Sequence, residues 1–380
     1  MANELEDPKK IPFNPSLKTV LYIKRDEDGC GYYRCYKPAL ALSRTGLMNA
    51  IVDMQSATPE HIKQADIVVF QALGTLASIE AMDFAIKEKK TIVAEVDDYL
   101  QVVSPNNPGY TSWHPGNLIL HRALEQIKKA DAMTVSTPQL AREYFPFNPN
   151  IYILPNYLSK PHWDDLPLTK KRDGIIRIGW AGGNAHADDL RTIAPVIEKL
   201  VKEYAGKVRF ETMGMTKAEL SGVFKMQEFF DLCPKCGYQG EMQYYPGEKI
   251  DEYPQILCSY GWDIAVAPIL NTAFNCSKSD LKLKEYSAVG YPVVASRVQP
   301  YIEAQEHGAN VRLASTFKEW YNYLKELIEN PELRDKIAKD NKEWIKKYWM
   351  DDNAQHYHNA YQEILTINKN SHGSNTGSNS

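Results

Sequence analysis

Cysteine is scarce in this sequence, with 6 among 380 residues, which is too few for a disulfide-stapled scaffold. No apolar run approaches the roughly 20 residues that span a bilayer, and the polar start of the chain lacks the apolar core of a signal peptide. A strong charge of one sign is also missing, because 44 Lys and Arg face 48 Asp and Glu. A protein that coats nucleic acid is therefore disfavoured, and we expect a soluble, cytoplasmic protein.

The composition excludes a largely disordered chain, since 43% of residues are hydrophobic and 24% are charged. A length of 380 residues favours two domains. Short apolar runs such as 19–23 and 67–70 alternate with amphipathic stretches. This alternation stops at the polar segment 159–174 and restarts at 175–180. The pattern predicts an α/β fold of two Rossmann-like, parallel-sheet domains.

The domain boundaries follow from these breaks in the pattern. We expect an N-terminal domain over 1–160, a C-terminal domain over 161–345 and a helix over 346–370 that crosses back to the first domain. The last ten residues, 371–380, are polar and of low complexity, which is typical of a disordered tail. Ligands of open α/β domains bind beyond the carboxyl ends of the strands, so the site is expected in a central cleft.

Two loops of the first half carry groups suited to a ligand. In the segment 26–34 (DEDGCGYYR), Gly29 and Gly31 permit a tight turn, and Tyr32 and Arg34 follow at the start of a helix. This arrangement suits a phosphate. The alternative is an ordinary turn between strand and helix, with an arginine on the surface. In the segment EVDDY, Asp97 and Asp98 follow a strand and could bind hydroxyls or a metal, or accept a proton. The alternative is a helix-capping aspartate.

A glycine loop opens the second half in the sequence GWAGGNAHADD. Gly182 and Gly183 can present backbone N–H groups to a diphosphate, together with Asn184, and His186 adds a further donor. The loop has neither the lysine of a P-loop nor the spacing of a dinucleotide fingerprint. A plain turn between strand and helix is the alternative interpretation.

The segment 267–296 is the most informative. Lys278, Lys282 and Glu285 are spaced by four and three residues, so they can share one face of a helix. A cation at a helix N-terminus opposes the helix dipole, and a bound diphosphate would explain it. A solvated face with a routine Lys–Glu pair is the alternative. The remaining candidates beside this helix start are Asn275, Ser277 and Ser279.

Cys233 and Cys236 have the spacing of half a zinc site. The usual second Cys-x-x-Cys is missing, so a structural zinc ion would need Cys258 and Cys276, or a second chain in a homodimer. A tight loop without metal is the alternative.

Taken together, these four loops resemble those of the GT-B glycosyltransferases, particularly the retaining family-4-like group and a branch found in bacteria and their viruses. Glu285 matches the second glutamate of that group's signature, which contacts the nucleotide ribose. The first glutamate falls on Ser277 and is absent. Gly182 and Gly183 match the family's glycine turn. Its usual Arg and Lys phosphate pair is not in place, so Lys278 and Lys282 are expected to supply that charge.

The resemblance implies transfer of a sugar from a UDP- or GDP-sugar donor to an acceptor hydroxyl. It implies retention and no cofactor for catalysis. From the loops themselves, we expect Asp97, Asp98, His186 and Lys278 to form the catalytic set. The acceptor stays open between a glycan, a protein and a modified DNA base, and a phage-encoded enzyme would work in the host cytoplasm. Two alternatives remain: a non-catalytic nucleotide- or sugar-binding protein on a degenerate GT-B scaffold, and a nucleotide-sugar epimerase.

Overall fold

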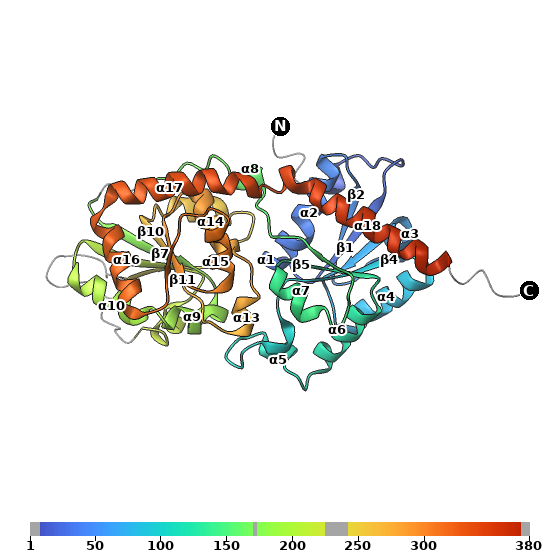
Figure 1. The fold of residues 1–380 in the computed structure, drawn as a ribbon, viewed down its shortest axis with the longest axis horizontal. Helices are drawn as coiled ribbons and strands as arrows, with labels where there is room; N and C mark the ends of the chain where they lie inside the picture. The colour runs from blue at the N-terminus through green and yellow to red at the C-terminus, as the bar shows by residue number, and fades with distance from the viewer. Residues whose placement is uncertain (1–7, 170–172, 225–241, 374–380) are drawn as a thin grey trace, which may run out of the picture.

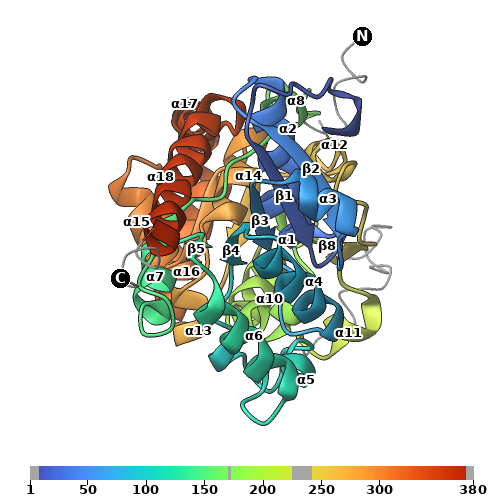
Figure 2. The same cartoon turned by 90° about the vertical axis from the view of Figure 1, so that its right-hand side faces the viewer.

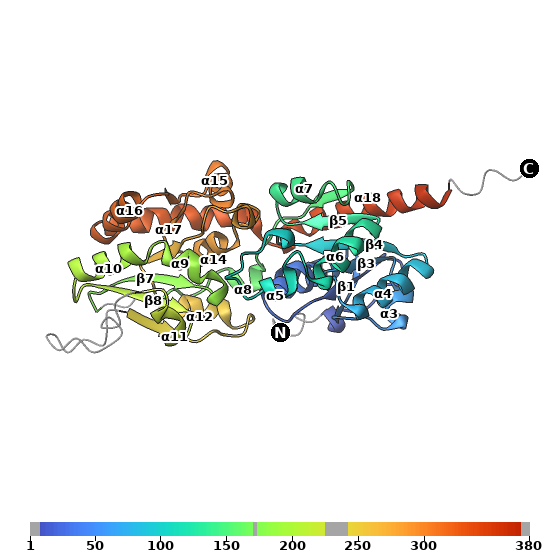
Figure 3. The same ribbon diagram turned by 90° about the horizontal axis from the view of Figure 1, so that it is seen from below.

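Two six-stranded parallel sheets lie side by side along the long axis of the molecule (Figures 1 and 3). The computed structural model describes residues 8–169, 173–224 and 242–373. The first sheet has the strand order β2-β1-β3-β4-β5-β6. Its strands are β1 (Thr19–Lys24), β2 (Asn49–Met54), β3 (Ile67–Phe70), β4 (Thr91–Val96), β5 (Ala132–Val135) and β6 (Ile151–Ile153). The expected α/β architecture of two Rossmann-like domains is confirmed.

The second sheet has the order β12-β11-β10-β7-β8-β9. Its strands are β7 (Ile176–Ala181), β8 (Val208–Met213), β9 (Met242–Tyr245), β10 (Ile264–Ala267), β11 (Val293–Ser296) and β12 (Arg312–Ala314). In each sheet, the chain first adds strands toward one edge, then returns to the centre and adds the remaining strands toward the other edge. This reversal lies between β1 and β3 in the first sheet and between β7 and β10 in the second. Open parallel sheets bind ligands at such reversals.

Helices connect and cover the strands. In the first half they are α1 (Gly29–Gly31), α2 (Lys37–Arg44), α3 (Pro59–Gln64), α4 (Leu76–Lys87), α5 (Tyr110–Trp113), α6 (Leu118–Lys129) and α7 (Pro138–Tyr144). In the second they are α8 (Lys160–Trp163), α9 (Ala187–Arg191), α10 (Ala194–Glu203), α11 (Lys217–Ser221), α12 (Tyr253–Ser259), α13 (Ala273–Cys276), α14 (Leu281–Val289), α15 (Gln299–Glu306), α16 (Phe317–Glu329), α17 (Pro331–Ile345) and α18 (Ala354–Gly373). Within the described residues no helix is both long and apolar enough to cross a membrane.

Each strand sends alternate side chains to opposite faces of its sheet, and both faces are buried. Leu21 and Ile23 of β1 pack with residues of α3, α4, α6 and α7. Val20 and Tyr22 of the same strand pack with α2 and α18. Period-two alternation places neighbouring residues on opposite faces. The near-continuous apolar strands of this sequence are therefore the strands of covered parallel sheets.

The last helix lies against the first domain (Figures 1 and 2). Tyr361 of α18 is fully buried, and its hydroxyl lies 2.9 Å from that of Tyr22. The chain crosses between the domains twice, and the two crossings are hydrogen-bonded to each other. Leu158 N–H donates to the Tyr348 carbonyl at 3.0 Å, and Met350 N–H donates to the Leu158 carbonyl at 2.8 Å. The crossings therefore form one paired connection.

Several elements differ from the sequence expectation. The amphipathic stretch 188–203 after the glycine loop forms two helices, α9 and α10, and not one, because Pro195 in the first turn of α10 has no N–H to continue a helix. The linker 159–174 contains α8, whose Trp163 is fully buried in the core of the second domain. Helix α18 continues to Gly373, and residues 374–380 lie outside the described residues.

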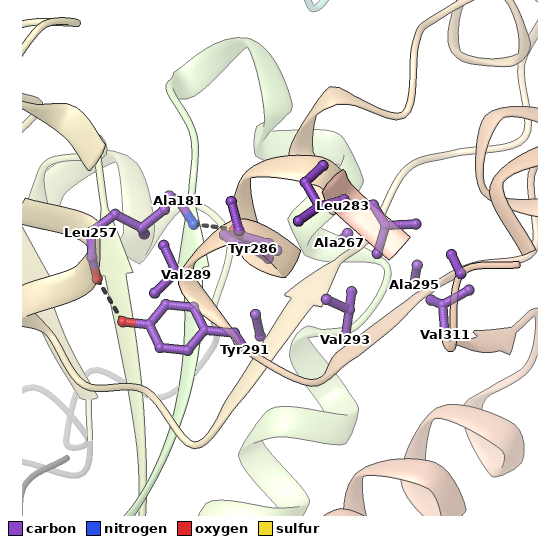
Figure 4. Packing of buried hydrophobic residues seen from close by; sticks show 14 of the residues in the cluster. Ala181, Leu257, Ala267, Leu283, Tyr286, Val289, Tyr291, Val293, Ala295 and Val311 are labelled. Carbon is purple, nitrogen blue, oxygen red and sulfur yellow. Dashed lines mark hydrogen bonds between the residues drawn. The ribbon is translucent and has the colours of Figure 1, made fainter. Parts of the chain in front are cut away.

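Helix α14 is held rigidly, which matters because it carries candidate site residues. Leu283, Tyr286 and Val289 pack into the core of the second domain (Figure 4). The Tyr286 hydroxyl accepts a hydrogen bond from Ala181 N–H at 2.8 Å. The helix ends at Gly290, whose φ of 94° is the left-handed conformation of a glycine C-cap.

Candidate functional site

Two adjoining cavities lie between the domains, where the loops after the strands converge. The larger cavity has a volume of about 440 Å³ and the smaller one about 210 Å³. The larger cavity is lined by Arg25, Asp98, Leu100, Val102, Val103, Ser104, Asn107, Gly109, Trp113, Ala185, His186, Asp188, Asp189, Leu270, Thr272, Phe274, Asn275 and Lys278. The smaller cavity is lined by Cys30, Asp97, Asp98, Asn156, His186, Ile269, Lys278, Ser279, Leu281, Lys282, Glu285 and Tyr301.

Three predicted residues, Asp98, His186 and Lys278, line both cavities. Lys278 follows α13 and precedes α14, so it lies in a loop and not on the helix where the sequence placed it. Its Nζ donates to Asp98 Oδ1 at 3.1 Å across the cleft. Burial alone would lower the pKa of Lys278, but the Asp98 carboxylate raises it above its ordinary value. The ammonium group is therefore charged at neutral pH.

His186 is oriented by a carboxylate that has several partners. Its Nδ1 lies 2.8 Å from Asp189 Oδ2, while Asp189 Oδ1 accepts from Asn275 Nδ2 at 2.9 Å and from Leu270 N–H at 2.7 Å. Burial lowers the pKa of His186 despite this carboxylate. The predicted Asn275 thus has a defined place, where it links α13 to the glycine loop.

In the smaller cavity, Lys282 and Glu285 of α14 lie beside Ser279. Glu285 Oε1 accepts from the Tyr33 hydroxyl at 2.8 Å, and Oε2 accepts from the Tyr253 hydroxyl at 3.3 Å. Burial raises the pKa of Glu285, while Lys282 and the two tyrosines oppose the shift. Tyr33 belongs to the first domain, so this carboxylate is held from both sides of the cleft.

Within the described chain, Lys282 has fewer polar partners than Glu285. Its Nζ donates to the Ala181 carbonyl, and no carboxylate in the described part of the chain forms an ion pair with it. Burial lowers the pKa of Lys282, and Glu285 and Asp189 oppose this only in part. The Lys282 side chain is half-buried, and a partly desolvated cation without an anion is unfavourable. The smaller cavity is therefore suited to an anionic ligand.

Asp97 faces the smaller cavity next to Cys30, which sequence reasoning did not single out. Burial raises the pKa of Asp97, and the charge of Asp98 adds to the shift. Burial likewise raises the pKa of the Cys30 thiol. The thiol is therefore protonated at neutral pH and suited to donate a hydrogen bond to Asp97, not to act as a nucleophile.

Arg34 is placed differently from its predicted role in donor binding. It is fully buried beneath the cleft, where Nε donates to Glu95 Oε1 at 2.7 Å and Nη2 donates to Oε2 at 3.0 Å. Nη1 donates to the Leu154 carbonyl at 2.6 Å and to Asn156 Oδ1 at 2.9 Å. Its donors are thus committed to the first domain.

The remaining predicted site residues within the described ranges do not line either cavity. Ser277 is buried, and its hydroxyl donates to the Ala273 carbonyl at 2.9 Å. The two glycine turns, Gly29 with Gly31 and Gly182 with Gly183, are close in sequence to residues that line the cavities. The predicted Tyr32 is buried, and the predicted Asn184 is exposed. Cys233 and Cys236 lie outside the described residues. Among those described, no cluster of three or more His, Cys, Asp or Glu side chains could hold a metal ion.

Besides Cys30 and Tyr33, Asn156 and Tyr253 also escaped the sequence analysis. Asn156 follows β6, and its Nδ2 donates to Ser279 Oγ at 2.8 Å across the cleft. Its place after a strand was a usable signal. Tyr253 lies on α12, and no local pattern connects it to Glu285.

The fold of the chain is that of the GT-B glycosyltransferases. Sucrose-phosphate synthase from Thermosynechococcus elongatus superposes with a TM-score of 0.64 at 12% identity, over 92% of this chain and 99% of that chain. Anabaena HepE in complex with UDP and glucose gives 0.59 at 12% identity, over 95% and 100%. TarM gives 0.55 at 13% identity over 85% of this chain, which spans 58% of the length of TarM. No protein-family model matches the chain, and no curated protein matches it in sequence.

Proposed function

We propose that the protein is a glycosyltransferase that uses a nucleoside-diphosphate sugar. The observation that carries this proposal is the wall of Asp98, His186 and Lys278 shared by two cavities. A transfer reaction needs a donor and an acceptor to meet at one set of groups. The smaller cavity is the place for the diphosphate, since no described carboxylate forms an ion pair with its Lys282. Structures of HepE and TarM hold UDP, which favours a uridine donor.

The residues divide the work as follows. Lys282 and the backbone of Gly182 and Gly183 bind the diphosphate, and Glu285 binds the ribose hydroxyls. The acceptor hydroxyl attacks the anomeric carbon from the same face that the diphosphate oxygen leaves, so the bond to the acceptor oxygen forms as the bond to the diphosphate oxygen breaks and the configuration is retained. Lys278 stabilises the charge that develops on this oxygen. Asp98 lies on the acceptor side of the same wall and takes the hydroxyl proton, which requires its release from Lys278.

The proposal extends to the domains and the stereochemistry. Residues 1–160 and 161–345 act as the acceptor and donor domains, and 346–370 ties the last helix to the first domain. The paired crossing at Leu158 and Met350 is the hinge about which they close on the donor. We propose retention at the anomeric carbon, which NMR of the first-formed product anomer tests.

A nucleotide screen tests the donor site directly. We expect UDP or GDP to raise the melting temperature of the full chain, because a ligand that binds only the folded state stabilises it. Lys282→Ala should abolish the shift, while Lys207→Ala, at an exposed lysine, should keep it. A shift of equal size in Lys282→Ala would contradict the assignment of the smaller cavity.

A non-catalytic binding protein and an epimerase remain the competing functions. The specific observation is Ser277, whose buried hydroxyl stands where the family has an acid. Donor consumption decides between them. A binding protein shifts its melting temperature with the nucleotide but leaves the sugar attached, and an epimerase converts the donor without releasing the nucleotide.

Tyr33→Phe tests how Glu285 is positioned. The substitution removes one of two hydrogen bonds to a buried carboxylate, and such bonds contribute about 1.5–3 kcal/mol. We expect the dissociation constant for the nucleoside diphosphate to rise about tenfold or more, measured by calorimetry. Tyr32→Phe, on the neighbouring residue, serves as the matched control. Equal affinity of Tyr33→Phe and the unmodified chain would show that Tyr33 does not orient Glu285.

A further inference from the structure

The two cavities differ in how their charges are balanced. In the larger cavity, each cation already has a carboxylate partner. Lys278 pairs with Asp98 at 3.1 Å, and Arg25 pairs with Asp26 at 3.3 Å. Of the other two carboxylates in its wall, Asp188 pairs with Arg191, and Asp189 is held by hydrogen bonds from Asn275 Nδ2 and Leu270 N–H and lies 2.8 Å from His186 Nδ1. Lys282, which has no ion pair within the described ranges of the chain, lines the smaller of the two cavities and not the larger.

The larger cavity also has apolar surfaces. Seven apolar side chains, from both domains, line it: Leu100, Val102, Val103, Trp113, Ala185, Leu270 and Phe274. The Arg25 guanidinium lies 5.8 Å from the centre of the Trp113 ring, and the Lys278 ammonium lies 4.4 Å from that of Phe274. The aromatic rings and the paired charges therefore stand next to each other in one wall.

Hydrogen-bonding groups without net charge complete this cavity. Ser104, Asn107, Thr272 and Asn275 contribute hydroxyl and amide groups. Asn106, beside this wall, donates from Nδ2 to Asp188 Oδ2 at 2.8 Å and so joins the two domains at the cavity rim. Each of these groups already has a partner within the chain: Ser104 Oγ accepts from Asn106 N–H at 3.3 Å, Asn107 Oδ1 from Gly109 N–H at 2.8 Å and Thr272 Oγ1 from Asn275 N–H at 3.2 Å, while Asn275 Nδ2 donates to Asp189 Oδ1. A hydroxyl or an amide can form more than one hydrogen bond, so these groups can also bind the hydroxyls of a ligand.

From this pattern we infer that the acceptor enters the larger cavity as a neutral saccharide ring and not as a phosphate-bearing group. This inference rests on the proposed function, because it names the acceptor of that reaction. A sugar ring has hydroxyls for the polar groups and C–H surfaces for the apolar walls. To pair with Lys278 or Arg25, a phosphate would have to displace the Asp98 or Asp26 carboxylate. Otherwise the phosphate would lie beside carboxylates and have no cation of its own. Phosphate-rich acceptors such as DNA are disfavoured for the same reason.

Direct binding tests the inference without turnover. Saturation-transfer NMR on the full chain would compare methyl glycosides of common hexoses with the matching hexose 6-phosphates. We expect at least one methyl glycoside to bind with a dissociation constant at least tenfold lower than its phosphorylated counterpart. Equal or tighter binding of the phosphate, or no binding of any glycoside where a phosphate binds, would overturn the inference.

Two variants assign the binding to this cavity. Trp113→Ala should weaken glycoside binding at least fivefold, and Trp113→Phe should restore most of it.

Val102→Lys adds a cation without a partner to a partly exposed position in the wall, and it should raise the relative affinity for the hexose phosphate. Val102→Gln is the uncharged control. The melting temperature without ligand checks that each variant is folded. Unchanged glycoside affinity in Trp113→Ala and unchanged preference in Val102→Lys would contradict the assignment.

Failure of this inference can be told apart from failure of the proposed function. The nucleotide screen and donor consumption depend on the smaller cavity and test the transferase proposal. Glycoside binding to the larger cavity is read without any nucleotide. A chain that consumes its donor but prefers a phosphorylated acceptor keeps the proposed function and loses the inference.

Discussion

Lys278→Ala is expected to lower kcat by about 10²–10³-fold, the effect of removing one preorganised charge that stabilises a developing anion. Lys278 is the cation in the wall between the two cavities, and the Asp98 carboxylate keeps it charged at neutral pH. Single-turnover measurement of sugar release from the donor would give the rate of the chemical step without product release.

The matched variant is Lys278→Arg, which keeps the charge and should recover part of the rate. Arg cannot copy the compact ammonium group in full. The nucleotide-induced melting shift should persist in both variants, because the proposed principal cation for the diphosphate is Lys282. A kcat within threefold of the unmodified enzyme in Lys278→Ala would remove Lys278 from the catalytic set.

Arg34→Ala is expected to lower the free energy of unfolding by about 3–5 kcal/mol, the usual cost of breaking a buried ion pair by deleting one partner. Arg34 and Glu95 are both buried, and Glu95 also accepts from Thr134 Oγ1 at 2.5 Å. Without the guanidinium, the Glu95 carboxylate and the Leu154 carbonyl each lose a partner. Equilibrium urea unfolding, followed by tryptophan fluorescence, would measure the loss.

The double variant Arg34→Met, Glu95→Gln is the control for this prediction. It removes both charges together, so no uncompensated carboxylate remains, and it should recover a large part of the stability. The same proteins decide the role first expected for Arg34. If the role of Arg34 is structural, the folded double variant binds the nucleoside diphosphate with unchanged affinity. A selective loss of nucleotide binding at normal stability would instead indicate that Arg34 contributes to donor binding.

The strands and the loops after them were predictable because their signals are local. The runs at 19–23 and 67–70 are apolar on both faces, as strands of covered parallel sheets must be, and they appear as β1 and β3. The same topology puts the loops after β4, β7 and β10 at the cleft. Asp98, His186 and Lys278 were therefore found from the rule that ligands bind at the carboxyl ends of strands.

The directions of individual side chains were not predictable. Arg34 follows a glycine turn, as a phosphate-binding arginine would, yet its partner Glu95 lies 61 residues later in the chain. The bond from Tyr33 to Glu285 spans 252 residues and joins two domains. No window of sequence contains both members of such a pair, so composition and spacing carry no information about it.

The sequence by itself determined the two α/β halves and the loops in which the ligand groups lie, since hydrophobic periodicity and glycine turns are properties of neighbouring residues. Only the tertiary structure decided which of those groups face a cavity and which are buried. It paired Arg34 with Glu95, left Lys282 without an ion pair among the described residues, and gave both Lys278 and Arg25 of the larger cavity a carboxylate partner. Charge balance depends on distances between residues far apart in the chain, and these distances exist only once the two domains are packed against each other.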